Sequence, residues 1–367
     1  MKTKITVIAF LAVTAGAFAY TRPHKAIPSD LRDAPADSDR FDTSIPVFAK
    51  GGENVPEPKA VEAVDTGIND TSKSIYGTDD RLDYYAARKD RQALADSVVS
   101  FWSKGDVEIR TSFGRPDSMD ENTVIASLGS FGATLVSSQY VCRGERFSEQ
   151  PVGAFCSGVL VGKDLVMTAG HCITDEYACR QARIVFGYAV KKEGDMAVTR
   201  VPADEVYNCS RILKRFQSGE PGSPAPAGQK LGPDFALIQL DREVKGHKPL
   251  VINRNEGVKA GDGVFVIGHP LGLPLKVAGA ANVRDNSKVG YFVADLDTFG
   301  GNSGSPVFNA STKKIEGILV RGANDMLPSP DGRYCLRMAT YEQTGGRGED
   351  VTKISVLADF IPKLQGE

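Results

Sequence analysis

A serine surrounded by glycines is the residue of this sequence best suited to nucleophilic chemistry. The stretch DTFGGNSGSPVF, residues 297–308, places Ser303 between Gly301 and Gly304. A glycine has no Cβ, so its backbone adopts positive φ values easily and a substrate carbonyl can come close. The N–H groups of Gly301 and Ser303 would then converge on one point and stabilise an oxyanion. We expect Ser303 to attack a carbonyl carbon; the alternative is an ordinary glycine-rich turn.

A serine hydroxyl is a weak nucleophile unless a base lies within hydrogen-bond reach and a third group orients that base. His171 ends the run CSGVLVGKDLVMTAGHC, residues 156–172, whose apolar part has strand character. Asp234 opens a second apolar run, DFALIQL. Of the other histidines, His24 lies in the N-terminal lead, His247 follows a glycine in a polar loop, and His269 precedes a proline. The alternative interpretation of His171 is a turn histidine buried beside a disulfide, and that of Asp234 is a helix or strand cap.

The two long stretches together resemble the chymotrypsin-like (trypsin-like) serine proteases, in which TA(A/G)HC carries the general base and G(D/N)SG the nucleophile. The order His171, Asp234, Ser303 is also the order of that family. The resemblance implies that Asp234 is buried against His171, holds one imidazole tautomer and stabilises the imidazolium. It further implies a secreted serine endopeptidase that forms an acyl-enzyme on Ser303, acts on protein or peptide substrates and needs no cofactor and no metal.

The residue before the serine narrows the resemblance. Animal enzymes of the family have an Asp there, which receives a new N-terminal amine on activation, whereas this chain has Asn302. Activation by such a salt bridge is therefore not expected. An Asn at this position resembles the bacterial glutamyl-endopeptidase-like group. The resemblance runs from about residue 124 to residue 364 and is weaker from residue 74.

Signals for the residue preceding the scissile bond conflict. Asp297 stands where trypsin-like enzymes keep the acid that binds Lys or Arg. Glutamyl endopeptidases also have an Asp there, followed by a Thr that matches Thr298, and bind acidic side chains through that Thr and a His. Leu319 occupies the place of that His, and Arg321 stands nearby.

Arg321 leaves two interpretations open. Its planar guanidinium would form a bidentate pair with a substrate carboxylate if it enters the pocket, or it points to solvent from the pocket rim. We expect an acidic preference, because Thr298 and Asn302 both match the glutamyl-endopeptidase pattern. A basic preference is the alternative if Asp297 is exposed at the pocket base.

Short Val-, Ile- and Phe-rich runs broken by Gly, Pro, Asn and Asp predict an all-β barrel or sandwich. Strands are expected at 134–142, 159–168, 183–188, 197–202, 235–240, 263–268, 291–294, 305–308 and 315–320. The resemblance implies two antiparallel six-stranded Greek-key barrels, residues 124–250 and 251–367, with the substrate cleft between them. Apolar spacing predicts a short amphipathic helix over 90–102, with Trp102 in the core, and a C-terminal helix over 354–364.

The first 73 residues differ in texture from the rest. Residues 1–19 have the charged, apolar and small-residue regions of a secretory signal; a membrane anchor is the alternative, but the apolar run is shorter than the roughly 20 residues of a span. Residues 20–73 are rich in Pro, Asp, Ala and Ser, which predicts a pro-segment or disordered lead, or else a permanently attached flexible arm. SIYGTDDRLDYY then opens an N-terminal arm, residues 74–123, and resembles the start of mature bacterial proteases, which puts a processing site near residue 73.

Composition restricts the partners. A net charge of -2 indicates neither a nucleic-acid nor a membrane-surface partner, and we expect a soluble monomer that is extracellular or periplasmic. Six cysteines in an exported chain favour disulfides over a metal site. The resemblance implies a Cys156–Cys172 bridge; the other four can pair in several ways, of which we take Cys179 with Cys209 and Cys142 with Cys335.

Two rival functions fit part of the pattern. A non-catalytic binding module on the same fold, like known pseudo-proteases, usually lacks one member of the Ser, His and Asp set, and this chain has all three. An esterase of the α/β-hydrolase type needs a G-x-S-x-G elbow and a different order of triad residues. GNSGS at 301–305 lacks the final glycine of that elbow.

Overall fold

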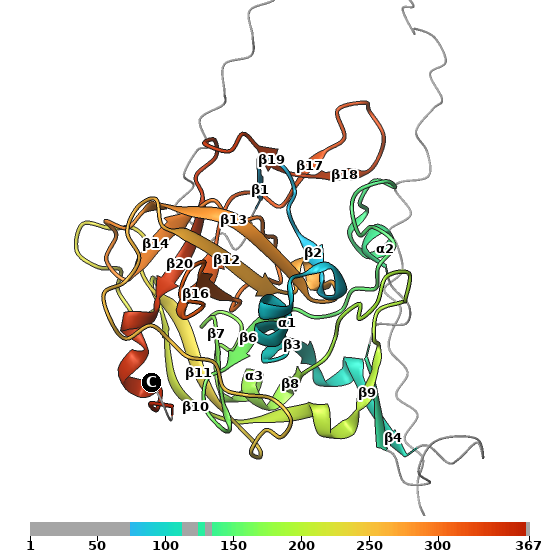
Figure 1. Cartoon of the computed structure of the whole chain (residues 1–367), viewed down its shortest axis with the longest axis horizontal. Coiled ribbons are helices and arrows are strands. Elements are labelled where there is room, and N and C mark those ends of the chain that lie inside the picture. The colour runs from blue at the N-terminus through green and yellow to red at the C-terminus, as the bar shows by residue number, and fades with distance from the viewer. Residues whose placement is uncertain (1–73, 112–123, 129–133, 365–367) are drawn as a thin grey trace, which may run out of the picture. The chain divides into compact units, whose positions relative to one another are not determined.

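Six strands close into a first barrel in the computed structural model, which describes residues 74–111, 124–128 and 134–364 (Figure 1). They pair antiparallel around the barrel, each with the next and the last with the first. In spatial order they are β3 (Val98–Ser103), β6 (Cys156–Leu160), β7 (Leu165–Thr168), β11 (Asp234–Leu240), β10 (Val206–Gln217) and β8 (Ala182–Val185).

A second set of six strands closes in the same way. In spatial order they are β12 (Gly263–Gly268), β13 (Lys276–Asp285), β14 (Tyr291–Ala294), β20 (Glu349–Lys353), β16 (Ile315–Arg321) and β15 (Pro306–Asn309). β2 (Leu82–Asp83) adds to the free side of β13. If the six strands of a barrel are numbered in chain order, their order around each barrel is 1, 2, 3, 6, 5, 4. This is a Greek-key arrangement. The prediction of two six-stranded antiparallel Greek-key barrels is confirmed.

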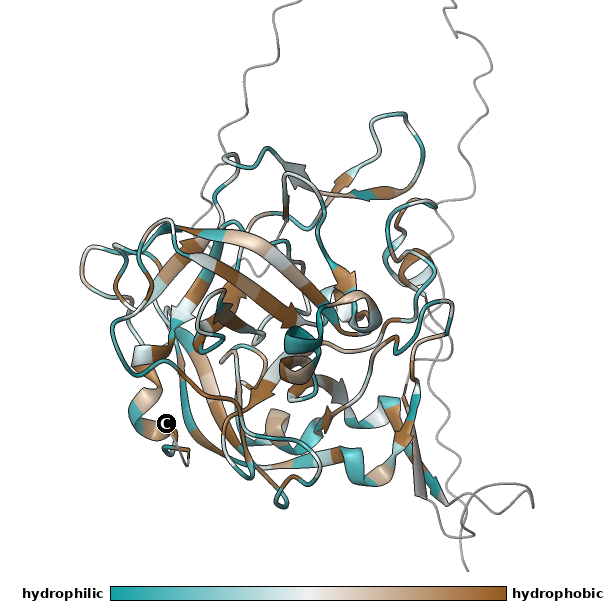
Figure 2. Ribbon diagram, in the orientation of Figure 1, coloured by the Kyte–Doolittle hydropathy of each residue, from teal (hydrophilic) through white to brown (hydrophobic). Residues whose placement is uncertain are grey.

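The two barrels share a hydrophobic core. Phe101 and Leu237 of the first barrel belong to the same buried cluster as Phe265 and Ile318 of the second. Figure 2 shows much of the brown, hydrophobic ribbon on the barrel strands. Loops that leave the strands at the junction are therefore held against a continuous packed interior, which fixes their relative positions.

The remaining elements are short. Paired strands outside the barrels are β1 (Ile75–Tyr76) with β19 (Thr340–Tyr341), β17 (Met326–Pro328) with β18 (Leu336–Met338), and β4 (Val107–Thr111), β5 (Val124–Leu128) and β9 (Arg200–Pro202). The helices are α1 (Lys89–Ala95), α2 (Leu135–Gln139), α3 (Glu176–Gln181) and the 3₁₀ helices Tyr84–Ala86, Lys104–Asp106, Ala203–Glu205, Pro270–Gly272, Ile354–Val356 and Ala358–Phe360. Every helix among the described residues is too short or too polar to cross a membrane.

The helix predicted over 90–102 is wrong in its second half. α1 ends at Ala95, and β3 follows from Val98. Consecutive β-branched and aromatic residues in β3 fit a strand buried on both faces, which mimics helical spacing over so short a run. Trp102 is buried as expected and packs edge-on against Tyr188, with 5.0 Å between ring centroids. The first barrel therefore begins before residue 124.

Two further segments differ from the sequence predictions. The strand predicted over 134–142 is wrong, because Thr134 and Ser137 form a reciprocal cap that starts α2, and Tyr140 ends the helix with φ of 55°. The C-terminal segment contains two single 3₁₀ turns rather than one continuous helix. The long strands β10 and β13 and the strand β20 were not predicted, since charged and polar residues interrupt their apolar pattern.

Three disulfides pair all six cysteines: Cys142–Cys335, Cys156–Cys172 and Cys179–Cys209. These are the pairs expected from the sequence. The Cys156–Cys172 bridge joins the first residue of β6 to the residue after His171. It therefore ties the loop that contains the histidine to β6.

Candidate active site

The Asp234 carboxylate holds His171 through both of its oxygens. Oδ2 lies 2.6 Å from His171 Nδ1. Oδ1 accepts the backbone N–H groups of Gly170 at 2.6 Å and of His171 at 3.2 Å. A carboxylate can only accept from Nδ1, so the Nδ1–H tautomer is fixed and Nε2 remains as the basic nitrogen.

Asp234 is almost fully buried, with 2% of its surface exposed. Burial acts to raise the pKa of Asp234, but the hydrogen bond and charge of His171, the charge of Arg321 and the Gly170 N–H outweigh it, so the pKa lies below its ordinary value. The carboxylate therefore stays ionised at neutral pH and can stabilise an imidazolium beside it.

Strand pairing brings His171 and Asp234 together. β7 and β11 are neighbours, with Thr168 opposite Ala236, so the loop after β7 lies beside the start of β11. Thr352 on β20 of the second barrel fixes the backbone of the acid, because its Oγ1 accepts from Asp234 N at 3.0 Å and donates to Asp234 O at 2.9 Å. Thr352 was not predicted as part of the site, because its strand was not predicted.

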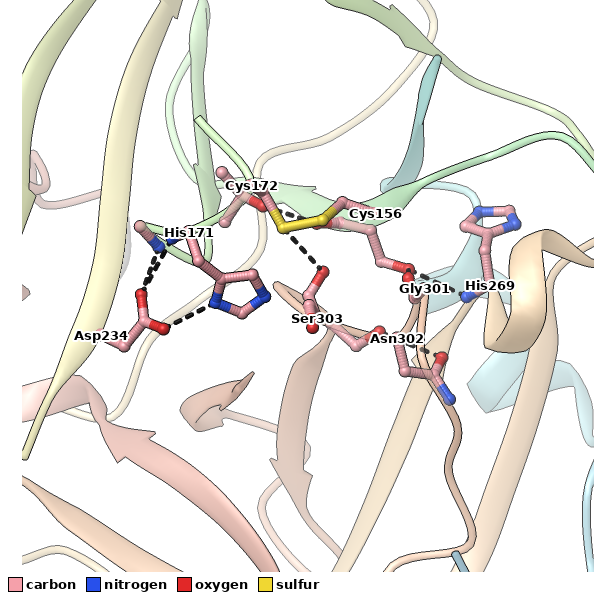
Figure 3. The surroundings of a disulfide bond; sticks show 12 residues. Cys156, His171, Cys172, Asp234, His269, Gly301, Asn302 and Ser303 are labelled. Carbon is pink, nitrogen blue, oxygen red and sulfur yellow. Dashed lines mark hydrogen bonds and ion pairs between the residues drawn. A yellow bond between two sulfur atoms is a disulfide. The ribbon is translucent and has the colours of Figure 1, made fainter. Parts of the chain in front are cut away.

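Ser303 lies on the side of the imidazole opposite Asp234, and the Cys156–Cys172 disulfide lies beside it (Figure 3). The carbonyl of Ser303 accepts from Ser157 N on β6 at 2.9 Å, which joins the serine loop of the second barrel to the first barrel. The structure thus brings His171, Asp234 and Ser303 together in the order that a nucleophile, a base and an orienting acid require.

The predicted oxyanion loop depends on two glycines with positive φ, 83° at Gly301 and 88° at Gly304. A Cβ on Gly301 would lie 2.6 Å from the carbonyl oxygen of His269, and one on Gly304 would lie 2.1 Å from that of Ser157. Ser157 was missed by the sequence analysis: its Oγ donates to Gly301 O at 2.8 Å and accepts from His269 N at 2.9 Å. This side chain therefore orients the peptide that follows Gly301.

Potential metal-ligand atoms gather at one place within the described ranges. A ring nitrogen of His171 and the sulfurs of Cys156 and Cys172 lie within 4.8 Å of one another. Both sulfurs belong to a disulfide and cannot act as thiolate ligands. The cluster is a disulfide packed near the imidazole and has no capacity for a metal ion.

The residues predicted to bind the substrate side chain are buried. Asp297, 5% exposed, accepts from Tyr76 N at 2.8 Å and Asp80 N at 2.9 Å, so it anchors the N-terminal arm and is not exposed at a pocket base. Thr298 is fully buried, and its Oγ1 donates to Glu349 Oε2 at 2.9 Å. Glu349 had no role in the sequence analysis.

Neither orientation predicted for Arg321 is found. Arg321 is 2% exposed, its Nε donates to Asp350 Oδ2 at 3.1 Å, and a terminal nitrogen donates to Gly232 O at 2.6 Å. A guanidinium taken out of water needs such partners, and Asp350 supplies the charge that a substrate carboxylate was expected to supply. Leu319 is fully buried in the core of the second barrel.

Asp297, which is buried, and Asp80, which is partly buried, form a carboxyl pair. Burial, and next the charge of Asp297, raises the pKa of Asp80 to about 7, and burial raises the pKa of Asp297 to about 6. Asp79 and Arg81 are the other charged groups that act on Asp297. Between about pH 4 and pH 7, the folded protein therefore keeps protons on these two carboxyl groups, whereas an unfolded chain, with an Asp pKa near 3.9, has released them.

Known proteins match this chain in part. The trypsin-like peptidase domain family matches residues 156–318. Glutamyl endopeptidases of Staphylococcus aureus strains MRSA252 and MW2 are each 27% identical over 173 residues, which is 46% of this chain and 43% and 47% of theirs. The chain thus spans less than half the length of these relatives. A solved structure of Glu endopeptidase in complex with MPD is 15% identical, with a TM-score of 0.42, over 78% of this chain and 97% of that one. The family matches confirm the resemblance drawn from the motifs.

The carboxyl pair predicts a pH dependence of stability. The pKa values of Asp80 and Asp297 are raised in the folded state. The contribution of this pair to the free energy of unfolding is therefore present below pH 4 and is lost as the pH rises through about 6 to 7. Asp80→Asn removes one charge and should flatten the decline in melting temperature between pH 5 and pH 8, measured by calorimetry. Exposed Asp359→Asn is the control and should keep the wild-type slope; an equal slope in Asp80→Asn would contradict the assignment.

Proposed function

We propose that this chymotrypsin/trypsin-like serine protease of the glutamyl-endopeptidase group is an exported endopeptidase that hydrolyses peptide bonds through an acyl-enzyme on Ser303. Its substrates are proteins or peptides, and it acts as a monomer outside the cytoplasm. The observation that carries the proposal is the 2.6 Å contact between Asp234 Oδ2 and His171 Nδ1, on the side of the ring opposite Ser303 (Figure 3).

Acylation begins with removal of the hydroxyl proton of Ser303 by His171 Nε2. The serine Oγ attacks the carbonyl carbon of the scissile peptide bond, and the carbonyl oxygen becomes an oxyanion. Asp234, which remains ionised, stabilises the imidazolium that forms. His171 then gives the proton to the leaving nitrogen, the C–N bond breaks, and the acyl group stays on Ser303.

Deacylation repeats these steps with water as the nucleophile. His171 Nε2 takes a proton from the water, the hydroxide attacks the ester carbon, and the proton returns to Ser303 Oγ as the acid product leaves. The N–H groups of Gly301 and Ser303 stabilise both oxyanions, and each such donor typically contributes about a hundredfold or more in rate. The hydrogen bonds of Ser157 support this geometry by fixing the Gly301 carbonyl.

Export and trimming form the second part of the proposal. Residues 1–19 would be a signal peptide and 20–73 a pro-segment, both outside the described residues. Support comes from Ser74, which is fully buried, with its carbonyl accepting from Thr298 N at 3.1 Å and its Oγ donating to Asn324 O at 2.8 Å. The arm from residue 74 is thus part of the packed enzyme, and the mature chain must retain it.

Ser303→Ala should abolish both covalent labelling by a fluorophosphonate probe and hydrolysis of casein. Loss of one triad member lowers the rate by several orders of magnitude, because the triad acts as a unit. Ser311→Ala, an exposed turn serine, is the matched control and should keep wild-type labelling and rate. Casein cleavage by Ser303→Ala at the wild-type rate would exclude the mechanism, whereas a wild type that is neither labelled nor active would favour the rival binding-module function.

N-terminal sequencing of protein purified from the culture medium tests the trimming. We expect a start close to Ser74, because the residues from Ser74 onward are packed into the enzyme. A fully active protein that begins at Tyr20 would show that residues 20–73 are not an inhibitory pro-segment.

A further inference from the structure

The peptide bond between Gly170 and His171 is held from both of its sides. Its N–H, on His171, donates to Asp234 Oδ1 at 3.2 Å. Its C=O, on Gly170, accepts from Arg215 Nε at 2.8 Å. The C=O and N–H of a trans peptide bond point in opposite directions. A carboxylate and a guanidinium therefore fix the backbone from which the imidazole extends.

Strand pairing places Arg215 at this peptide bond. Arg215 on β10 lies opposite Ala236 on β11. Ala236 in turn lies opposite Thr168, the last residue of β7, after which the histidine loop begins. A Cβ on Gly170 would lie 2.6 Å from Phe216 O, so the loop packs directly against β10. The Gly170 carbonyl is thus within reach of a β10 side chain, and Arg215 binds it.

Glu220 fixes the orientation of this guanidinium. Its carboxylate oxygens accept from Arg215 Nη1 at 2.7 Å and from Nη2 at 2.8 Å, and Gln217 Oε1 accepts from Nη2 at 2.7 Å. A bidentate pair of this kind sets the direction of a guanidinium as well as its position. The hydrogen bond from Arg215 holds the pKa of Glu220 below its ordinary value, so the carboxylate is ionised at neutral pH.

Glu220 is placed by a tight turn in the loop that leads to the orienting acid. Ser223 N donates to Glu220 O at 2.9 Å, which closes the turn. Ser218 N donates to Pro233 O at 3.0 Å, so the two ends of the loop meet directly before Asp234. The same loop therefore supplies the anchor of the guanidinium and the approach to the acid.

We propose that Arg215 is a positioning residue for the general base. It fixes the backbone of His171 through the Gly170 carbonyl, and Glu220 holds the guanidinium in place. The role rests on the proposed function, in which His171 takes the proton of Ser303. Arg215 acts through the orientation of the imidazole and not on the reacting atoms. A displacement of about 1 Å of a catalytic group can lower the rate about a hundredfold.

The kinetic test compares wild type with Arg215→Ala. We expect kcat on a peptide p-nitroanilide to fall roughly tenfold to a hundredfold with KM changed less than about twofold, because the base is displaced and the substrate contacts remain. Arg211→Ala is the matched control. Arg211 lies on the same strand, its Nε donates to the Gln239 side chain at 2.8 Å, and its variant should keep the wild-type kcat.

Proton NMR measures the position of the base without any substrate. The His171 Nδ1–H lies in a 2.6 Å contact with Asp234 Oδ2 and should give a strongly downfield resonance. We expect this resonance to move upfield in Arg215→Ala, because the imidazole is no longer fixed against the carboxylate. It should keep its wild-type position in Arg211→Ala.

A double-variant cycle tests whether Glu220 acts through Arg215. Glu220→Gln should lower kcat by a smaller factor than Arg215→Ala, and the double variant should have the kcat of Arg215→Ala, because residues that share one interaction are not additive. A wild-type kcat in Arg215→Ala, an unmoved resonance or additive losses would each overturn the proposal. If Arg215→Ala fails to fold, Glu220→Gln decides: a lower kcat and a moved resonance support the proposal, and wild-type values of either overturn it.

Fluorophosphonate labelling separates this proposal from the proposed function. A wild type that is neither labelled nor active contradicts the proposed function, and the NMR comparison then still decides whether Arg215 fixes His171. A labelled, active wild type whose kcat survives Arg215→Ala contradicts only the role of Arg215.

Discussion

The buried charge of Asp234 is the constraint on which the rest of the site depends. Moving a carboxylate out of water costs several kcal/mol unless partners replace the lost hydration. His171 and the Gly170 backbone supply those partners from the first barrel. Thr352 supplies another from the second barrel by fixing the backbone of the acid. The triad is therefore stable only where the two barrels are correctly docked, and catalytic geometry follows from the junction of the barrels.

Arg321 belongs to the same electrostatic arrangement. Its charge lowers the pKa of Asp234, and its hydrogen bond to Gly232 O holds the chain two residues before the acid. Asp350 in turn stabilises the guanidinium that would otherwise be buried without a counter-charge. A residue that was expected to select the substrate thus supports the orienting acid, and one buried guanidinium cannot fill both roles.

The candidate triad could be predicted from the sequence because its signals are local. A glycine-flanked serine, a histidine at the end of an apolar run and an acid at the start of another can each be recognised within a dozen residues. Ser157, Thr352 and Glu349 act through partners more than 50 residues away in the chain, and nothing in their own neighbourhood marks them. The two-barrel fold was also predictable, through the resemblance, whereas the strands with mixed polar composition were not.

The errors at Asp297 and Arg321 share a physical cause. A charged residue close to the nucleophile in the sequence is expected to lie near the substrate. Its effect depends, however, on the counter-charges that the tertiary structure places beside that residue. The carboxylate of Asp297 accepts backbone N–H groups of the arm, Asp350 pairs with Arg321, and Glu349 bonds to Thr298. Each of these partners comes from a distant segment. The charge of this region therefore depends on the arm and on β20, which lie outside the motif.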